Sequence, residues 1–298
     1  MRLMLTGANG QVGWELRRSL APLGKVIALD RDQCDLSRPE RLPDIVREVG
    51  ADVIVNAAAY TSVDKAEQEE ALATVVNGTA VGVLAEEARR TGALFVHYST
   101  DYVFDGEKPT PYGEDDAPRP VNAYGRSKLA GETALRQSGA SYIILRTGWV
   151  YAARGRNFVH TILGLAKDRD ELRIVDDQTG APTWAHDVAE ATAPITRAVH
   201  VEHIQKAFTS GPFNVTAAGA TSWYGFAGAI LDEATRAGLL ARKPQLTPIA
   251  SSDYPSPATR PKNSQLSGER LKAQFGIALP DWRQSLVRCI AEMRASSG

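Results

Sequence analysis

The sequence predicts an α/β protein with a doubly wound parallel sheet and a smaller C-terminal α/β lobe. Three observations predict this fold class. A short apolar run leads directly into the glycine-rich turn at residues 6–13, short apolar runs then alternate with helical patterns, and the alternation becomes less regular after about Trp149. Alternating strands and helices are typical of a parallel sheet covered by helices on both faces. We therefore expect a first domain at residues 1–149 and a second lobe formed mainly by residues 150–298, with some later segments returning to the first domain.

The first half supplies the strands and helices of the expected sheet. Short runs rich in β-branched residues fit strands that are buried on both faces. We expect such strands at residues 3–5, 26–29, 53–55, 94–97 and 142–145, and helices that start near Gln11, Pro39, Glu69 and Asn122.

The second half is expected to form the smaller lobe. Helical patterns cover residues 157–167, 186–200, 222–236, 268–275 and 280–294, and shorter β segments cover 172–175 and 213–215. Residues 251–262 contain too many prolines for regular structure and are expected to form a long loop. Long loops in compact enzymes often act as lids or binding loops.

Composition excludes several classes of protein. The chain has 298 residues, 43% hydrophobic and 23% charged residues, and a formal net charge of −1. This balance provides no basic field for nucleic acid or a membrane surface, and no apolar run reaches the ~20 residues that span a bilayer. Cys34 and Cys289 lack metal-ligand spacing and are expected to be reduced thiols. With the glycine turn following the first strand at once, no signal sequence is expected, and the protein is expected to be cytoplasmic.

The glycine turn predicts a dinucleotide site. Gly7, Gly10 and Gly13 lie between a strand and a helix, where glycines permit a tight turn and let a pyrophosphate approach the helix N-terminus. This is the Rossmann-type arrangement, so residues 1–149 are expected to bind the cofactor. Asp30 ends the second strand, where a carboxylate can accept hydrogen bonds from the adenosine ribose. Arg31 follows at once and could pair with a 2′-phosphate, so we expect NADPH and NADH both to be usable.

Tyr124 and Lys128 predict proton transfer beside that cofactor. A spacing of four residues puts both side chains on one face of a helix. A lysine ammonium favours the phenolate, so we expect Lys128 to move the pKa of Tyr124 from about 10 toward neutrality. Thr100 closes the fourth strand, and its hydroxyl is the candidate partner for the tyrosine or a substrate carbonyl, with Ser99 as the competitor.

Longer blocks of sequence carry a specific resemblance. Several segments resemble the dTDP-4-dehydrorhamnose reductase family, in the extended branch of the short-chain dehydrogenase/reductases that acts on nucleotide sugars. These segments cover residues 10–16, 55–67, 97–104, 122–132, 146–151, 177–183 and 259–264, so the resemblance runs from end to end.

The resemblance implies reduction of the 4-keto group of dTDP-4-dehydro-6-deoxy-L-mannose to give dTDP-L-rhamnose. Tyr124 would donate the proton, Lys128 would hold the nicotinamide ribose, and Thr100 would bond near the sugar oxygen. Asp101 and Trp149 would touch the sugar, the second lobe would supply most of the substrate site, and Arg260 and Lys262 are the expected cations for the diphosphate. The residues implied to line the cofactor are Gln11, Val12, Asp30, Asp35, Leu36, Ala59, Tyr60, Thr61 and Tyr98.

A bound metal is not expected. By the same resemblance, Glu15 and Glu292 match acidic positions that hold a magnesium ion between subunits in some relatives. His186 stands where we expect the third acid, and magnesium prefers oxygen ligands. A homodimer remains open.

Three other functions stay open at this point. An epimerase or a 4,6-dehydratase is one, although Tyr102 follows Thr100 and Asp101 where a dehydratase has a second acid. A non-catalytic regulatory subunit is another, because a fold can keep a site that it no longer uses. Reduction of a related nucleotide 4-keto sugar is the third.

Overall fold

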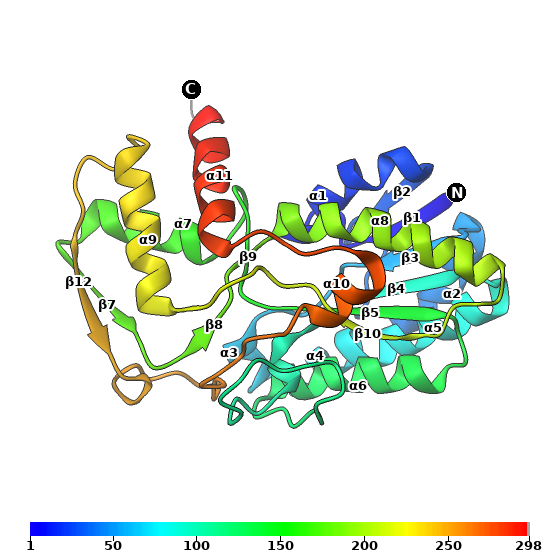
Figure 1. The fold of residues 1–298 in the computed structure, drawn as a ribbon. Helices are drawn as coiled ribbons and strands as arrows, with labels where there is room; N and C mark the ends of the chain where they lie inside the picture. Colours follow the sequence, from blue (N-terminus) through cyan, green and yellow to red (C-terminus); the bar gives the residue numbers. More distant parts are fainter. Residues whose placement is uncertain (297–298) are drawn as a thin grey trace.

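A six-stranded parallel sheet forms the centre of the first domain in the computed structural model, which describes residues 1–296 (Figure 1). The strand order is β10-β5-β4-β3-β1-β2, and every neighbouring pair is parallel. The carboxyl ends of all its strands therefore lie at one edge, which is where ligands bind in such sheets. The strands are β1 (Arg2–Thr6), β2 (Lys25–Leu29), β3 (Val53–Asn56), β4 (Leu94–Thr100), β5 (Tyr142–Thr147) and β10 (Gly211–Asn214).

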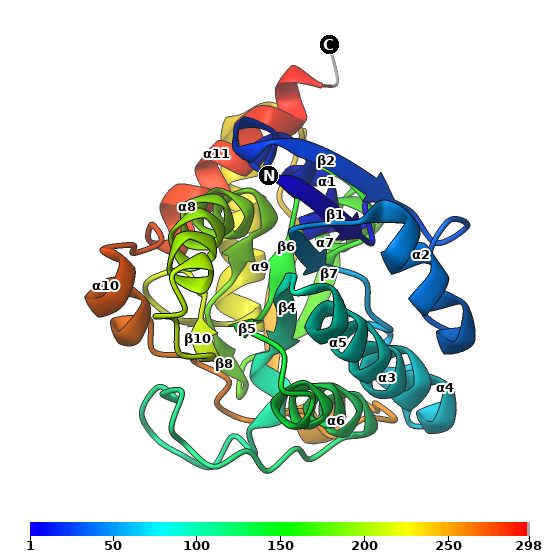
Figure 2. The same ribbon diagram turned by 90° about the vertical axis from the view of Figure 1, so that its right-hand side faces the viewer.

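Helices cover both faces of this sheet (Figure 2). On one face, α1 (Gln11–Ser19) and α8 (Ala185–Ile204) pack together over a core that includes Leu16, Val96 and Val188. On the other face lie α2 (Leu42–Val49), α5 (Ala80–Thr91) and α6 (Ala123–Gln137), over a second core. The doubly wound architecture expected from the sequence is confirmed.

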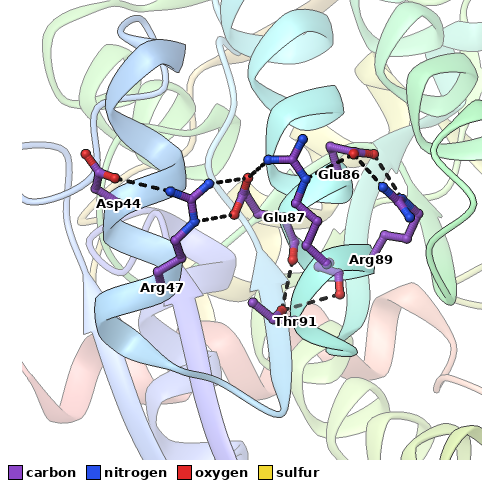
Figure 3. Close-up of polar contacts among 8 residues, drawn as sticks. Asp44, Arg47, Glu86, Glu87, Arg89 and Thr91 are labelled. Atoms are coloured by element: carbon purple, nitrogen blue, oxygen red, sulfur yellow. Dashed lines mark hydrogen bonds and ion pairs between the residues drawn. The ribbon is translucent and has the colours of Figure 1, made fainter.

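A charged network ties α2 to α5 on that second face (Figure 3). The Glu87 carboxylate is 2% exposed and accepts two hydrogen bonds from Arg47, each 2.9 Å long. Arg90 adds a third at 3.0 Å. Because the acid is buried, its paired donors offset the cost of removing it from water.

The second lobe has its own core between three helices (Figure 1). These are α7 (Phe158–Asp168), α9 (Trp223–Arg236) and α11 (Trp282–Ala295). Strands β7 (Glu171–Val175) and β12 (Gln245–Ile249) form a parallel pair beside them. Two short pairs complete the lobe: β6 (Val150–Tyr151) with β9 (Thr183–Trp184), and β8 (Thr179–Gly180) with β11 (Thr221–Ser222).

Shorter helices connect these elements. Helix α4 (Glu70–Thr74) continues through a π-helical turn, η3 (Val75–Thr79), into α5, and this turn places Asn77 inside the protein. The remaining short elements are α3 (Val63–Ala66), α10 (Glu269–Phe275) and the 3₁₀ turns η1 (Ala21–Leu23), η2 (Pro39–Arg41), η4 (Asp101–Val103) and η5 (Ser251–Asp253).

The structure corrects one part of the sequence interpretation. Residues 213–215 were expected in the smaller lobe, but β10 pairs with β5 and extends the main sheet. Helix α8 likewise returns to pack on α1. Strand β12 was not predicted, because Pro248 lies within it and proline is confined to edge strands. The proline-rich loop has a single 3₁₀ turn as its regular structure, as expected.

Two further observations concern the whole fold. Across residues 1–296, none of the helices combines the length and the apolar character that crossing a membrane requires. Both cysteines are free and buried, and burial raises the pKa of the Cys34 thiol to about 11.

Candidate active site

A cavity of about 1240 Å³ opens where the carboxyl edge of the sheet meets the second lobe. Its wall includes residues that follow β1, β2, β3, β4 and β5, together with Trp223 and Arg260 from later in the chain. All but two of the predicted site residues lie in this wall: Gly7, Gly10, Gln11, Val12, Asp30, Arg31, Asp35, Leu36, Ala59, Tyr60, Thr61, Tyr98, Thr100, Asp101, Tyr124, Lys128, Trp149 and Arg260. The exceptions are Gly13 and Lys262.

The glycine turn forms the floor under the N-terminus of α1. Gly7 has φ +70°, and a Cβ on it would lie 2.6 Å from the Ala58 backbone nitrogen. A Cβ on Gly13 would lie 2.1 Å from the Gly7 carbonyl oxygen. Gly13 therefore lies behind the wall and permits the close packing of turn and helix. Gly10, Gln11 and Val12 at the helix start line the cavity, and a helix N-terminus is a site where phosphate groups bind.

An acid and a cation stand together after β2. Asp30 accepts hydrogen bonds from the Asp32 and Gln33 backbone N–H groups, at 3.1 and 3.2 Å. The Arg31 side chain is 79% exposed, and its Nε lies 3.7 Å from Asp35 Oδ1. The backbone N–H of Ser37 lowers the pKa of Asp35, with help from Arg31. This corner can receive ribose hydroxyls or a ribose phosphate.

The segment after β3 is held rigidly. The Asn77 amide accepts from the Tyr60 backbone N–H at 2.8 Å and donates to the Tyr60 carbonyl at 3.0 Å. The Tyr60 hydroxyl donates to Glu69 at 2.5 Å, and this bond raises the pKa of the phenol. Ala59 and Thr61 flank this anchored position in the cavity wall.

Helix α6 presents Tyr124 and Lys128 to the cavity. The Asn122 side chain caps the helix by accepting from the Gly125 N–H at 2.8 Å, so Tyr124 lies in the first turn. Lys128 is 2% exposed, and its Nζ donates to the Tyr98 carbonyl at 2.6 Å. Burial lowers the pKa of Lys128 to about 8, and Glu132 opposes this effect.

The pKa of Tyr124 is shifted in the direction opposite to our expectation. Burial raises it to about 12, although the Thr100 hydroxyl favours ionisation. The prediction that Lys128 lowers this pKa was wrong, because Lys128 Nζ donates to the Tyr98 carbonyl and burial of the phenol raises its pKa. The phenol therefore stays protonated, which is the form that can donate a proton.

At the end of β4, the contacts of Thr100 and Ser99 show which hydroxyl lies beside Tyr124. Both residues line the cavity, and Thr100 donates to Asp101 Oδ1 at 2.9 Å. Ser99 donates at 2.7 Å to the buried Glu132, which also binds Arg146. The Ser99 hydroxyl is therefore committed to a structural network, and Thr100 is the hydroxyl beside Tyr124.

Asp101 is a buried acid with unused hydrogen-bonding capacity. Its Oδ2 lacks a hydrogen-bond partner of normal geometry among residues 1–296. Burial raises the pKa of Asp101 to about 6, and the hydroxyls of Thr100 and Ser264 act in the opposite direction. Gly148 makes room for this carboxylate, since a Cβ there would lie 2.4 Å from it.

Trp149 lies in the cavity wall where the two lobes meet. Its φ of 51° is unusual for a residue other than glycine, and its Nε1 donates to Ser264 at 2.9 Å. Its ring stacks on Trp223, so it is not simply a core residue. Trp223 was not predicted, because no sequence motif marks it.

Arg260 reaches the cavity and Lys262 does not. Arg260 Nη2 donates to Asp64 Oδ2 at 2.9 Å, which fastens the proline-rich loop to the first domain. Lys262 is exposed, away from the cavity wall. Three cations missed in the sequence, Lys65, Arg154 and Arg156, line the cavity. The Arg154 guanidinium stacks 3.5 Å over the Trp14 ring. The Arg-Gly-Arg run at residues 154–156 was the available signal.

Of the two acidic positions matched to magnesium ligands, Glu15 lies on α1 and Glu292 lies on α11. Glu15 Oε2 is 3.4 Å from His186 Nδ1 and 3.8 Å from Arg18 Nη2, which also binds Glu190 at 3.0 Å. Among the residues that the structure describes, His, Cys, Asp and Glu form no group of three suited to a metal ion.

A glycine turn at a helix start, an acid after β2 and a tyrosine–lysine pair beside a strand-end threonine define a dinucleotide-dependent reductase of the short-chain dehydrogenase type. A family model described as RmlD substrate binding domain matches residues 1–295. The chain belongs to the dTDP-4-dehydrorhamnose reductase family, which confirms the resemblance drawn from the sequence.

The individual relatives agree with this assignment. The chain is 55% identical to dTDP-4-dehydrorhamnose reductase of Burkholderia thailandensis, over 98% of this chain and 99% of that one. It is 45% identical to the Escherichia coli K12 reductase, over 98% of both. The crystal structure of the Bacillus anthracis reductase in complex with NADP is similar, with a TM-score of 0.88, 34% identity and coverage of 98% and 99%. A Thermus thermophilus UDP-glucose 4-epimerase, 22% identical over 99% and 100% with a TM-score of 0.79, shares the fold.

Proposed function

We propose that this protein reduces the 4-keto group of dTDP-4-dehydro-6-deoxy-L-mannose to dTDP-L-rhamnose with NADPH or NADH. The observation that carries the proposal is the convergence of Thr100, Tyr124 and Lys128 in the same cavity as the glycine turn. The names of the relatives supply the substrate, and the NADP complex of the Bacillus anthracis reductase supports the cofactor.

The residues present fit a nicotinamide dinucleotide. The close approach at Gly7 and Gly13 leaves the N-terminus of α1 open to a pyrophosphate, and Asp30 and Arg31 lie where an adenosine ribose would end. When bound, the nicotinamide supplies a hydride to the carbonyl carbon. Lys128 would hold the adjoining ribose hydroxyls.

Tyr124 would act as the proton donor. Its raised pKa keeps the phenol protonated at neutral pH, and the carbonyl oxygen gains basicity as it becomes an alkoxide. The Thr100 hydroxyl would orient the same oxygen. Lys128, one helical turn away, would supply positive charge as the phenolate forms.

The nucleotide sugar would lie where the two lobes meet. The Asp101 carboxylate would accept a hydrogen bond from a sugar hydroxyl, and Trp149 would offer an aromatic face. Arg260 would meet the diphosphate. The nucleotide-sugar substrate and the nicotinamide cofactor are both consistent with a cytoplasmic location.

A 4,6-dehydratase fits the site less well. Tyr102 follows Asp101 and is a buried phenol whose pKa burial raises, so it cannot replace a second carboxylate. A regulatory subunit without turnover is the competitor from another class. The intact Thr100, Tyr124 and Lys128 favour an enzyme over such a subunit.

The test is the loss of NADPH and NADH absorbance on mixing the purified protein with substrate generated in place by the two preceding enzymes. Oxidation with dTDP-L-rhamnose as product is expected, and the ratio of the two rates gives the cofactor preference. Tight cofactor binding without oxidation would overturn the proposal. It would favour a regulatory subunit or a reductase of another nucleotide sugar.

A further inference from the structure

A line of buried polar side chains runs behind Lys128, beneath the carboxyl edge of the sheet. Thr6 from β1, Asn56 from β3 and His97 from β4 are each 0% exposed. The Thr6 hydroxyl donates to Asn56 Oδ1 at 2.6 Å, Asn56 Nδ2 lies 3.2 Å from His97 Nδ1, and His97 Nε2 lies 3.5 Å from Lys128 Nζ. The line therefore ends on the lysine that the proposed function uses.

The orientation of the Asn56 amide is determined by the backbone. The Ala58 N–H donates to Asn56 Oδ1 at 3.2 Å, and a backbone N–H can only donate. Turning the amide over would set its NH₂ group against this N–H and lose the bond. The Nδ2 group of Asn56 therefore faces His97 as a donor.

This orientation selects the tautomer of His97. Because Asn56 donates to Nδ1, that ring nitrogen carries a lone pair, and the proton of the neutral ring resides on Nε2. Burial and the neighbouring Lys128 hold the pKa of His97 well below its usual value, so the ring is neutral. An N–H on Nε2 consequently faces Lys128 Nζ.

The consequence depends on the charge of Lys128. An ammonium has three N–H groups and no acceptor, so an N–H directed at it is repelled. A neutral amine has a lone pair that can accept from His97 Nε2 while one of its own N–H groups donates to the Tyr98 carbonyl at 2.6 Å. The His97 tautomer thus distinguishes the two charge states of Lys128.

We propose that His97, oriented by Asn56, is a positioning residue that favours the neutral amine of Lys128 in the ligand-free protein. This inference rests on the proposed function only in that Lys128 assists Tyr124. A lysine held this way can gain or lose its proton at moderately alkaline pH. The pH range of turnover would then depend on a side chain that touches neither cofactor nor substrate.

Three other titratable groups lie near Lys128. On α6, Glu132 favours the ammonium, but its carboxylate is bound by Arg136, Arg146 and Ser99. Tyr124, on the same helix, is a protonated phenol whose pKa is about 12. On β4, the Tyr98 hydroxyl is paired with Thr192 at 2.6 Å. His97 is therefore the neighbour from the sheet that directs a proton donor at Lys128.

The test is a direct titration of Lys128 by NMR in the ligand-free, full-length protein labelled at lysine ¹³Cε. The resonance that disappears in Lys128→Arg identifies the residue, and the wild type should titrate near the pKa of about 8. His97→Asn keeps an acceptor for Asn56 but removes the N–H directed at Lys128, so its midpoint should rise by about one pH unit, a tenfold change in the ionisation equilibrium. His97→Gln, whose amide oxygen can face Lys128, should shift it in the same direction.

Phe95→Leu is the matched control, since Phe95 is a buried, apolar residue of the same strand. It should leave the midpoint in place although it loosens the packing. Cofactor affinity and circular dichroism establish that each variant is folded. Equal midpoints in the wild type and both His97 variants would overturn the proposal.

The titration uses no substrate, so its failure and that of the proposed function are separable. If Lys128 assists Tyr124, the alkaline limb of the kcat profile should move with the midpoint in His97→Asn. A shift in midpoint without any turnover in the wild type would leave the His97 assignment standing and remove the proposed reaction. Turnover in the wild type with unshifted midpoints in the His97 variants would support the proposed reaction and remove the His97 assignment.

Discussion

The indole rings of Trp149 and Trp223 lie parallel at 2°, with their centroids 3.5 Å apart. Trp149 follows β5, and Trp223 begins α9, so the pair joins the two lobes at the cavity wall. A Cβ on Gly180 would lie 2.3 Å from the Trp149 ring, which shows how tightly the ring is held from behind. The position of the Trp149 ring in the cavity wall therefore depends on Gly180, which lies outside the cavity.

Gly180→Ala should displace Trp149. We expect KM for the nucleotide sugar to rise about tenfold or more, because small misplacements of positioning groups are costly. The Kd of the cofactor, measured by fluorescence titration, should not change. Gly164→Ala in α7 is the control, since nothing lies within 4 Å of its added Cβ. An unchanged KM in Gly180→Ala would show that Trp149 does not help to bind the sugar.

Tyr124→Phe should abolish turnover while cofactor and substrate still bind. Removing the proton donor is expected to lower kcat by about 100-fold or more. Stopped-flow absorbance measures the reaction, and calorimetry with each ligand measures binding. Full activity in this variant would remove Tyr124 from the proton-donor role.

Asp101→Asn should stabilise the protein in a pH-dependent way. The pKa of Asp101 is raised from 3.8 to about 6, so between these values the folded state binds the proton that the unfolded state has released. Folding stability of the wild type therefore falls as pH rises through this window, by up to about 3 kcal/mol. Thermal melts at pH 4 and pH 7 should show an advantage for Asp101→Asn that appears only at pH 7, together with weaker substrate binding.

Asp105 offers a control, because its pKa is shifted in the direction opposite to that of Asp101. The Tyr112 hydroxyl and other donors lower the pKa of Asp105, so its contribution to stability is present above the unfolded pKa and is lost as pH falls. Asp105→Asn should thus destabilise the protein at pH 7 and less so at pH 4. The same pH trend in both variants would contradict the assignment of Asp101 as an acid penalised by burial.

Arg31→Ala should shift the cofactor preference toward NADH. An arginine that pairs with a 2′-phosphate contributes about 1.5–3 kcal/mol through charged hydrogen bonds, so the ratio of kcat/KM for NADPH over NADH should fall about tenfold or more. Arg38→Ala, a nearby exposed arginine outside the cavity wall, should leave the ratio unchanged. An equal fall of this ratio in both variants would show that Arg31 acts through the general positive potential of the surface and not by pairing with the 2′-phosphate.

Arg260→Gln should weaken binding of the substrate diphosphate. Loss of a charged hydrogen bond is expected to raise KM for the nucleotide sugar about tenfold or more, with a smaller effect on kcat. Lys262→Gln is the matched control, because Lys262 is exposed and lies away from the cavity. Equal effects of the two variants would restore Lys262 as a diphosphate ligand.

The parts of the site that were predictable are those encoded in short stretches of sequence. The turn from Gly7 to Gly13 joins a strand directly to a helix, and Tyr124 and Lys128 occupy successive turns of one helix. Their relative positions follow from local geometry alone. Thr100 could be added because parallel strands end at a common edge.

What could not be predicted depends on which elements meet across the fold. Strand β10 joins the main sheet because β5 has a free edge for it, and Trp223 reaches Trp149 because α9 packs in the second lobe. The raised pKa of Tyr124 depends on burial, which its neighbours in sequence do not reveal. The line from Asn56 through His97 to Lys128 requires β3, β4 and α6 to be adjacent.

The sequence by itself determined the doubly wound fold, the cofactor turn, the family and the three residues proposed for the chemistry, because each is carried by a local motif or by the regular alternation of strands and helices. The tertiary structure alone decided which later segments return to the first domain, which cations reach the cavity and which ionisable groups are buried. The physical reason is that hydration and contact between distant side chains exist only once the chain has packed, and these set the charge state of Tyr124, Asp101 and Lys128.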